Sequence, residues 1–93
     1  MKNTAVLLIS CPDRKGIVAS VANFLYEQNA NILHADEHQD SELNLFFLRV
    51  EWDMTDFNLG KKAFNESFSK VALEFKMDWR VFYSDIKAKA KRI

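Results

Sequence analysis

The segment from Cys11 to Gly16 holds the residues whose types and spacing best suit binding of a small molecule. It reads Cys-Pro-Asp-Arg-Lys-Gly and stands between a strand-like and a helix-like run. A short turn into a helix exposes backbone N–H groups at the positive end of the helix dipole, where a carboxylate can bind. The Asp13 carboxylate beside those amides could take an ammonium group, so the segment suits an α-amino acid better than a phosphate. Alternatively, Asp13 only caps the helix and Gly16 only eases the turn.

A second set of polar side chains, His34, Asp36 and His38, recurs at every second position. In a strand these side chains share one face with neighbours about 7 Å apart, which leaves the two histidines about 13 Å apart. A zinc site needs at least three ligands that converge on one point, so the spacing favours a polar edge-strand face over a metal site. Contacts to a ligand or a partner are the third interpretation. We expect neither a metal nor a cofactor.

The sequence lacks the residue sets on which catalysis usually depends. It has one cysteine, two histidines and two glycines. It therefore offers no Cys/His pair close in sequence, no Gly-x-Ser-x-Gly turn and no glycine-rich phosphate loop. The single Cys11 also excludes an internal disulfide and a site with several thiolates. We expect no enzymatic activity from this chain alone.

Charge and composition narrow the classes of partner. Thirteen basic and thirteen acidic residues cancel to a net charge of zero, and four of the basic ones lie in the last seven residues. The remainder is mildly acidic, so neither nucleic acid nor an anionic membrane is an expected partner. An RNA-binding sheet would also need aromatic residues on both central strands, whereas the first strand is aliphatic. Because no apolar run reaches about 20 residues and no signal peptide is evident, we expect a cytoplasmic chain.

Apolar periodicity predicts six elements in this chain of 93 residues, enough for one domain. Strands are predicted over residues 4–10, 32–40, 46–53 and 77–84, and helices over 16–28 and 58–75. The third strand is the clearest, because apolar residues alternate strictly from Phe46 to Trp52. Pro12 is expected to stop the first strand, and residues 55–58 supply candidate N-caps for the second helix.

The element order βαββαβ predicts an α+β ferredoxin-like sandwich. Its four-stranded antiparallel sheet would have strands one and three in the middle and both helices on one face. Apolar and long side chains would then project from the other face, namely those of Leu45, Phe47, Arg49 and Phe82. Such a face needs a cover, so we expect self-association or a missing domain.

Several segments together resemble the N-terminal ACT domain of formyltetrahydrofolate deformylases. They are the run from Cys11 to Ala19, Asn31-Ile32, Asp40, Phe46-Phe47-Leu48-Arg49 and Met77-Asp78-Trp79-Arg80. The Asp-Arg-x-Gly loop and the Asn-Ile pair are general to ACT domains. The Cys-Pro-Asp opening, the Phe-Phe-x-Arg strand and the Met-Asp-Trp-Arg segment narrow the resemblance to the deformylases. It covers residues 5–83, nearly the whole chain.

The resemblance implies a regulatory domain, residues 1–85, that binds a small amino acid, with methionine or glycine as the expected effector. It also implies a homo-oligomer that pairs through edge strands. The parent enzyme would hydrolyse 10-formyltetrahydrofolate to tetrahydrofolate and formate, a step in one-carbon and purine metabolism. Catalysis would lie in a C-terminal formyltransferase-like domain, to which residues 86–93 would be a basic linker. The alternative is a stand-alone ACT-type regulator that acts by ligand-gated protein contacts.

Carried onto this sequence, the ligand site of ACT domains would comprise Asp13, Lys15, Gly16, Ile17, Asn31 and Ile32, with His34 as a further candidate. Asn31 has a physical reason to be there, because its amide can donate to a carboxylate and accept from an ammonium group. Phe47 and Arg49 would contact the catalytic domain or a second subunit, or form a merely packed or solvated pair.

Overall fold

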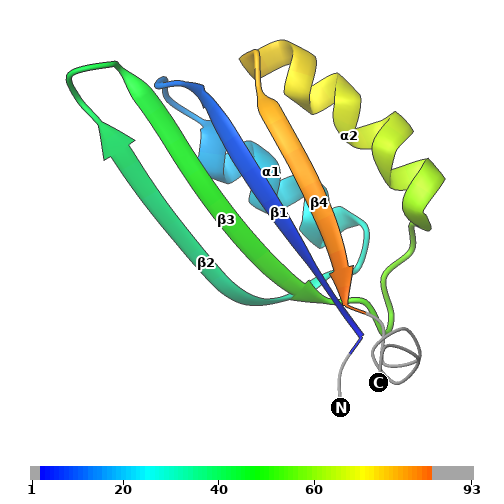
Figure 1. Cartoon of the computed structure of the whole chain (residues 1–93). Coiled ribbons are helices and arrows are strands. Elements are labelled where there is room, and N and C mark those ends of the chain that lie inside the picture. Colours follow the sequence, from blue (N-terminus) through cyan, green and yellow to red (C-terminus); the bar gives the residue numbers. More distant parts are fainter. Residues whose placement is uncertain (1–2, 85–93) are drawn as a thin grey trace, which may run out of the picture.

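The computed structural model describes residues 3–84, and its elements follow the predicted order (Figure 1). They are β1 (Thr4–Pro12), α1 (Ile17–Glu27), β2 (Asn31–Asp40), β3 (Leu45–Asp53), α2 (Lys61–Phe75) and β4 (Asp78–Ser84). The order βαββαβ confirms the ferredoxin-like class. The basic linker predicted over residues 86–93 lies outside the described residues.

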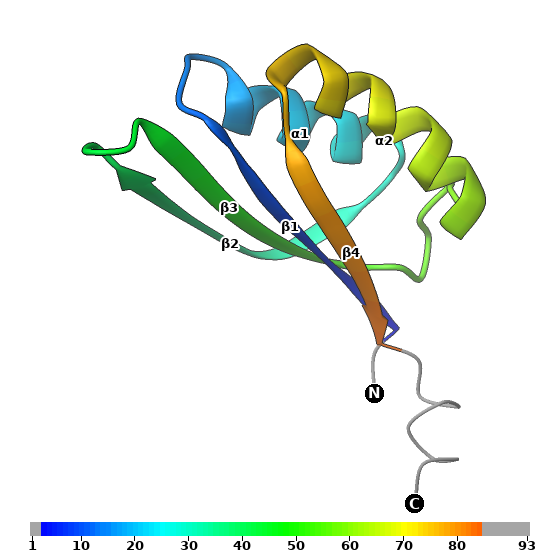
Figure 2. The ribbon, with the colours of Figure 1, turned by 45° about the horizontal axis from the view of Figure 1, so that its top comes forward.

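The four strands form one antiparallel sheet in the order β2-β3-β1-β4, so β1 and β3 are central as predicted. Both helices lie on the same face of this twisted sheet (Figures 1 and 2). The first strand pairs along its whole length with β3 and as far as Ser10 with β4: Thr4 stands opposite Asp53 of β3 and Ser84 of β4. No helix among residues 3–84 lies over the other face of the sheet, as the sequence predicted.

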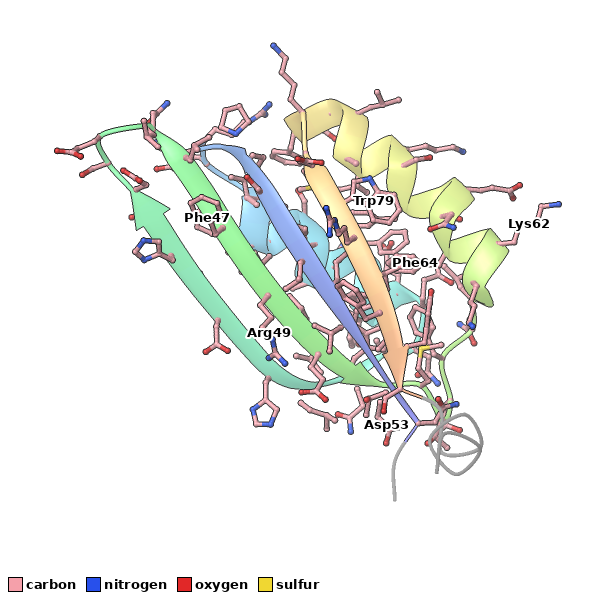
Figure 3. The ribbon with its side chains drawn as sticks, in the orientation of Figure 1. Phe47, Arg49, Asp53, Lys62, Phe64 and Trp79 are labelled. Carbon is pink, nitrogen blue, oxygen red and sulfur yellow. The ribbon has the colours of Figure 1, made fainter. Side chains whose placement is uncertain are left out.

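The core lies between the sheet and the helices, and alternation along the central strands determines which side chains enter it. In β3 the inward side chains of Phe46, Leu48, Val50 and Trp52 are at most 4 % exposed. Phe64 of α2 lies between the two layers (Figure 3). Its ring centroid lies 5.7 Å from that of Phe24 on α1, 5.6 Å from Trp52 and 6.1 Å from Trp79 on β4. These ring contacts join both helices to the sheet.

Two predicted boundaries were wrong. The first strand does not stop before Pro12, because Pro12 still pairs with Leu45. β4 pairs with β1 only as far as Ser10, so Pro12 has a neighbouring strand only on the β3 side. On the open side, its missing N–H costs no hydrogen bond between strands.

The second helix begins at Lys61 rather than at residue 58, and none of the predicted N-caps is used. Instead, Asp53 accepts hydrogen bonds from the backbone N–H and the hydroxyl of Thr55, which form a local turn. Phe57 then packs against Trp52 at 5.4 Å, so the chain needs three more residues before the helix can start.

Strand β2 is an edge strand that neither helix covers. Its inward positions Ala35, Glu37 and Gln39 stand opposite the buried Val50, Leu48 and Phe46 of β3, yet all three are exposed. A bulge at Leu33 shifts the register between Ile32 and His34. The α-helical layer therefore protects β3, β1 and β4 only (Figure 2).

We expect Phe64→Ala to lower the free energy of unfolding by about 3–5 kcal/mol, because the deletion leaves a cavity among the rings. Urea unfolding followed by circular dichroism would measure this. Leu73→Ala on the same helix is the matched control, since Leu73 is 79 % exposed; its effect should stay below about 0.5 kcal/mol. Equal losses for the two variants would contradict the assignment of the core.

Candidate functional site: the loop before the first helix

The N-terminus of α1 has no side-chain cap. Gly16 occupies the N-cap position in the left-handed conformation, with φ 90° and ψ 0°, and its carbonyl accepts the helical bond from Ser20 N at 2.9 Å. The first turn contains no acidic residue. Asp13 is therefore not the helix cap, so that half of the alternative interpretation is wrong, whereas Gly16 in the left-handed conformation does serve the turn. The amides from Ile17 onward remain at the positive end of the helix, where they suit an anion.

Asp13 is instead held at the end of β2. Its side-chain Oδ2 accepts a hydrogen bond from Gln39 Nε2 at 3.0 Å, and its backbone N–H donates to the carbonyl of Asn44 at 2.9 Å. The carboxylate is half-buried and lies at the same end of the sheet as the α1 N-terminus. A carboxylate and a set of free amides in one place can receive the two charged groups of an amino acid.

Arg14 fastens the other side of the loop to the end of α2. Its guanidinium carbon lies 4.5 Å from the centroid of the Phe75 ring, and Nη1 donates to the carbonyl of Glu74 at 3.4 Å. Lys15 and Gly16, which follow these anchors, are exposed. Asp13 and Arg14 thus fix the first half of the loop, and its second half is open to solvent.

Cys11 lies just before the loop, on the inward side of β1, and is 2 % exposed. Burial raises the pKa of its thiol, the Asp13 carboxylate raises it further, and Arg14 acts in the opposite direction. A buried thiol held in its neutral form is a poor nucleophile, so Cys11 serves the core.

The structure separates the two halves of the expected ligand site. Asn31 pairs with Asp53, which pairs with Thr4 at the start of β1, whereas Asp40 pairs with Leu45, which pairs with Pro12 at the end of β1. Steps of about 3.3 Å per residue place Asn31 about 26 Å and Ile32 about 23 Å along the sheet from the loop. Within one chain, the loop residues come together and the two residues from β2 do not join them.

The remaining expected residues divide between core and surface. The side chain of Ile17 is only 2 % exposed, so its backbone N–H is the group it can offer a ligand. His34 pairs with Glu51, which places it on the sheet face away from the helices, together with Asp36 and His38. Within residues 3–84, no group of three or more His, Cys, Asp or Glu side chains could hold a metal ion. No helix among these described residues is long and apolar enough to cross a membrane.

Two contacts of the loop were not predicted from the sequence: Gln39 orients Asp13, and Arg14 anchors the loop to α2. Gln39 falls on an inward position of β2, where an apolar residue is the normal choice; a glutamine there signals that the end of β2 is uncovered. No local pattern could have paired Arg14 with Phe75, because the two residues are far apart in the sequence.

A shallow groove of about 470 Å³ also crosses the uncovered face of the sheet. Phe47 and Arg49 project from β3 into this region (Figure 3). Arg49 lies 3.9 Å from both Asp36 Oδ2 and Glu51 Oε1. These are long, exposed ion pairs that contribute little stability.

Comparison with known proteins identifies the class to which this fold and loop belong. Residues 5–51 match the ACT domain family. A formyltetrahydrofolate deformylase from Synechocystis is 43 % identical over 82 residues, which cover 88 % of this chain and 29 % of that protein. A solved deformylase from Pseudomonas syringae superposes with a TM-score of 0.86 at 41 % identity, over 89 % of this chain and 28 % of the other. An ACT domain protein from Streptococcus pneumoniae, 16 % identical with a TM-score of 0.74, shares the fold.

The chain belongs to the ACT domain family. Within it, the chain is similar to the N-terminal ACT domain of formyltetrahydrofolate deformylases, as the Cys-Pro-Asp loop indicated. It spans less than a third of the length of these relatives.

Gly16→Ala should lower the free energy of unfolding by about 1 kcal/mol, because a side chain disfavours the left-handed backbone at φ 90°. An added Cβ would meet nothing within 4 Å, so backbone strain is the whole effect. Gly60→Ala is the matched control, since Gly60 has φ −76° and equally open surroundings. Urea unfolding should show that variant unchanged or slightly stabilised, and a similar loss in both would contradict the role given to Gly16.

Cys11 should react slowly with iodoacetamide in the native chain and quickly in urea, because the neutral thiol is buried. Asp13→Asn removes a negative charge that raises the thiol pKa, so the pH profile of labelling should move to lower pH. Asp56→Asn, at an exposed position elsewhere in the chain, is the control. An unmoved profile in Asp13→Asn would show that burial alone governs the thiol.

Proposed function

We propose that this chain is the amino-acid-sensing and dimerisation domain of a formyltetrahydrofolate deformylase. The observation that carries the proposal is the uncapped N-terminus of α1 beside the Asp13 carboxylate. The amides would bind the ligand carboxylate, and Asp13 would bind its ammonium group. Lys15 and Gly16 would border the site from the exposed part of the loop, and Ile17 would supply its backbone N–H.

A second copy would complete the site. If two β2 strands pair antiparallel at their free edges, Asn31 of one copy comes opposite Asp40 of the other. Asp40 follows Gln39, which holds Asp13, so the Asn31 amide and Ile32 of one copy would reach the loop of its partner. The two halves that lie about 26 Å apart in one chain would thus meet across the dimer.

The surroundings of β2 support this pairing. The strand has a partner on one side only, and its inward positions Ala35, Glu37 and Gln39 are exposed. Beside it, α1 presents an apolar stripe of Val18, Ala22 and Tyr26, of which Val18 is 40 % and Tyr26 77 % exposed. A second copy at this edge would pair with the outward backbone N–H and C=O groups of β2 and would cover the apolar stripe of α1. His34 would lie near that seam.

In such a deformylase, the reaction would belong to the part of the protein that this chain does not span. The domain would act on it only through a difference in ligand affinity between two states of the whole enzyme. The alternative is a free-standing regulator that changes its protein contacts on binding. Sequencing the coding frame beyond Ile93 decides between them, because a catalytic domain in frame supports the first and a stop codon the second.

Isothermal titration of the 93-residue chain with methionine and with glycine tests the sensing role. We expect one of them to bind, and we expect Asn31→Ala to weaken that binding about tenfold or more, because a charged carboxylate loses a hydrogen bond worth about 1.5–3 kcal/mol. Asn65→Ala, an exposed asparagine on α2, is the control.

No heat at millimolar concentrations of either amino acid would contradict the sensing role. Full affinity in Asn31→Ala would contradict the assignment of Asn31 but leave the sensing role standing.

A further inference from the structure

Eight outward side chains of the uncovered sheet face form two rows that cross all four strands. Strand register defines the rows, because residues paired across neighbouring strands stand side by side. The first row is His38, Phe47, Ser10 and Asp78, and the second is Asp36, Arg49, Leu8 and Arg80. Together these eight residues supply the outward lining of the 470 Å³ groove.

Each strand contributes one residue to each row, and the two residues from one strand complement each other chemically. On β4 the pair is Asp78 and Arg80, and on β2 it is His38 and Asp36. Asp78 and Arg80 carry opposite charges, and the ring N–H of a histidine such as His38 can donate to a carboxylate such as that of Asp36.

The central strands add packing pairs to these charged pairs. On β3 an aromatic ring, Phe47, is followed by the guanidinium of Arg49, a pairing favoured by cation–π attraction. On β1 the large Leu8, 38 % exposed, is followed by the small Ser10. The pair on β1 thus consists of a large and a small side chain, and the pair on β3 consists of a cation and an aromatic ring.

A surface of this kind is complementary to a second copy of itself. Consider a two-fold axis that lies between two facing sheets, runs across the strands and passes between the rows. It sets the first row of one copy on the second row of the other. Asp78 of one copy then faces the partner's Arg80, and Arg80 of that copy faces the partner's Asp78. Because the rows lie next to the axis, sheet twist displaces the facing residues little.

We propose that the uncovered face of this domain is a self-association surface in which two copies pack sheet to sheet about this axis. The surface is separate from the ligand loop and from the free edge of β2, so it does not rest on the proposed function. An axis passing through the second row itself would instead set Arg49 and Arg80 against their own counterparts, and like charges would oppose that arrangement.

The size of the face predicts a weak pairing. Four strands about 4.8 Å apart and seven residues at about 3.3 Å each give about 440 Å² per copy, or about 900 Å² in total. Stable interfaces usually bury about 1,200–2,000 Å², so the association should appear at high protein concentration.

Sedimentation velocity of the 93-residue chain, over a hundredfold concentration range that reaches about 1 mM, tests the proposal. Arg80→Glu should lower the association constant of the wild type at least about tenfold, because Asp78 and its new partner repel. The double variant Asp78→Lys with Arg80→Glu exchanges the two charges and should restore it. Lys62→Glu on the exposed outer side of α2 is the control for the same change in net charge (Figure 3).

These variants leave the other pairing untouched, because β4 and β2 are opposite edges of the sheet. If copies also pair through β2, the Arg80→Glu variant should remain a dimer held by that pairing. If they do not, the variant should remain a monomer. Assembly of Arg80→Glu equal to that of the wild type would overturn the proposal. Failure of the double variant to recover, while circular dichroism shows it folded, would also overturn it.

Discussion

The packing of Phe64 among rings from both layers is the interaction on which the rest of this structure depends. Through Phe24, Trp52 and Trp79 it connects α1, β3 and β4 to α2. Aromatic side chains bury large areas, so a small domain can build most of its core from a few of them. Because the rings gather over β3, β1 and β4, the core ends before it reaches β2.

That asymmetry gives a physical reason for the places of the proposed ligand loop and of the proposed pairing through β2. Strand β2 is held by hydrogen bonds to β3 on one side and by almost no apolar burial. Regions with few buried contacts open at lower free energy than the core, and they are the regions that proteins use for ligands and partners. The loop before α1 lies between the packed core and the uncovered strand β2. Its Arg14 contacts Phe75 of α2, and its Asp13 accepts a hydrogen bond from Gln39 of β2.

The sequence predicted what depends on local periodicity and missed what depends on distant contacts. Alternation from Phe46 to Trp52 and the stripe containing Phe64 gave the strand, the helix and their buried sides correctly. The start of α2 was placed three residues early, since Asp53 and Phe57 build a turn that only the tertiary packing favours. For the candidate site, residue types indicated the loop, but only the register reveals that Asn31 lies at the other end of the sheet. The resemblance to ACT domains groups loop residues with Asn31 and Ile32, which the structure places at opposite ends of the sheet within one chain; their meeting across two chains stays a prediction.

The position of β1 has a consequence for the order in which the chain folds. Its neighbours are β3 and β4, so the first and last described strands meet, with Thr4 beside Ser84. During synthesis, β1 emerges first but its second neighbour emerges last, and contacts between such distant segments form slowly. The pairing of β1 with β4 can therefore form only after the rest of the described chain has been made. In the finished fold, the start of β1 and the end of β4 lie side by side (Figure 1), so the polypeptide enters and leaves the described domain at one corner of the sheet.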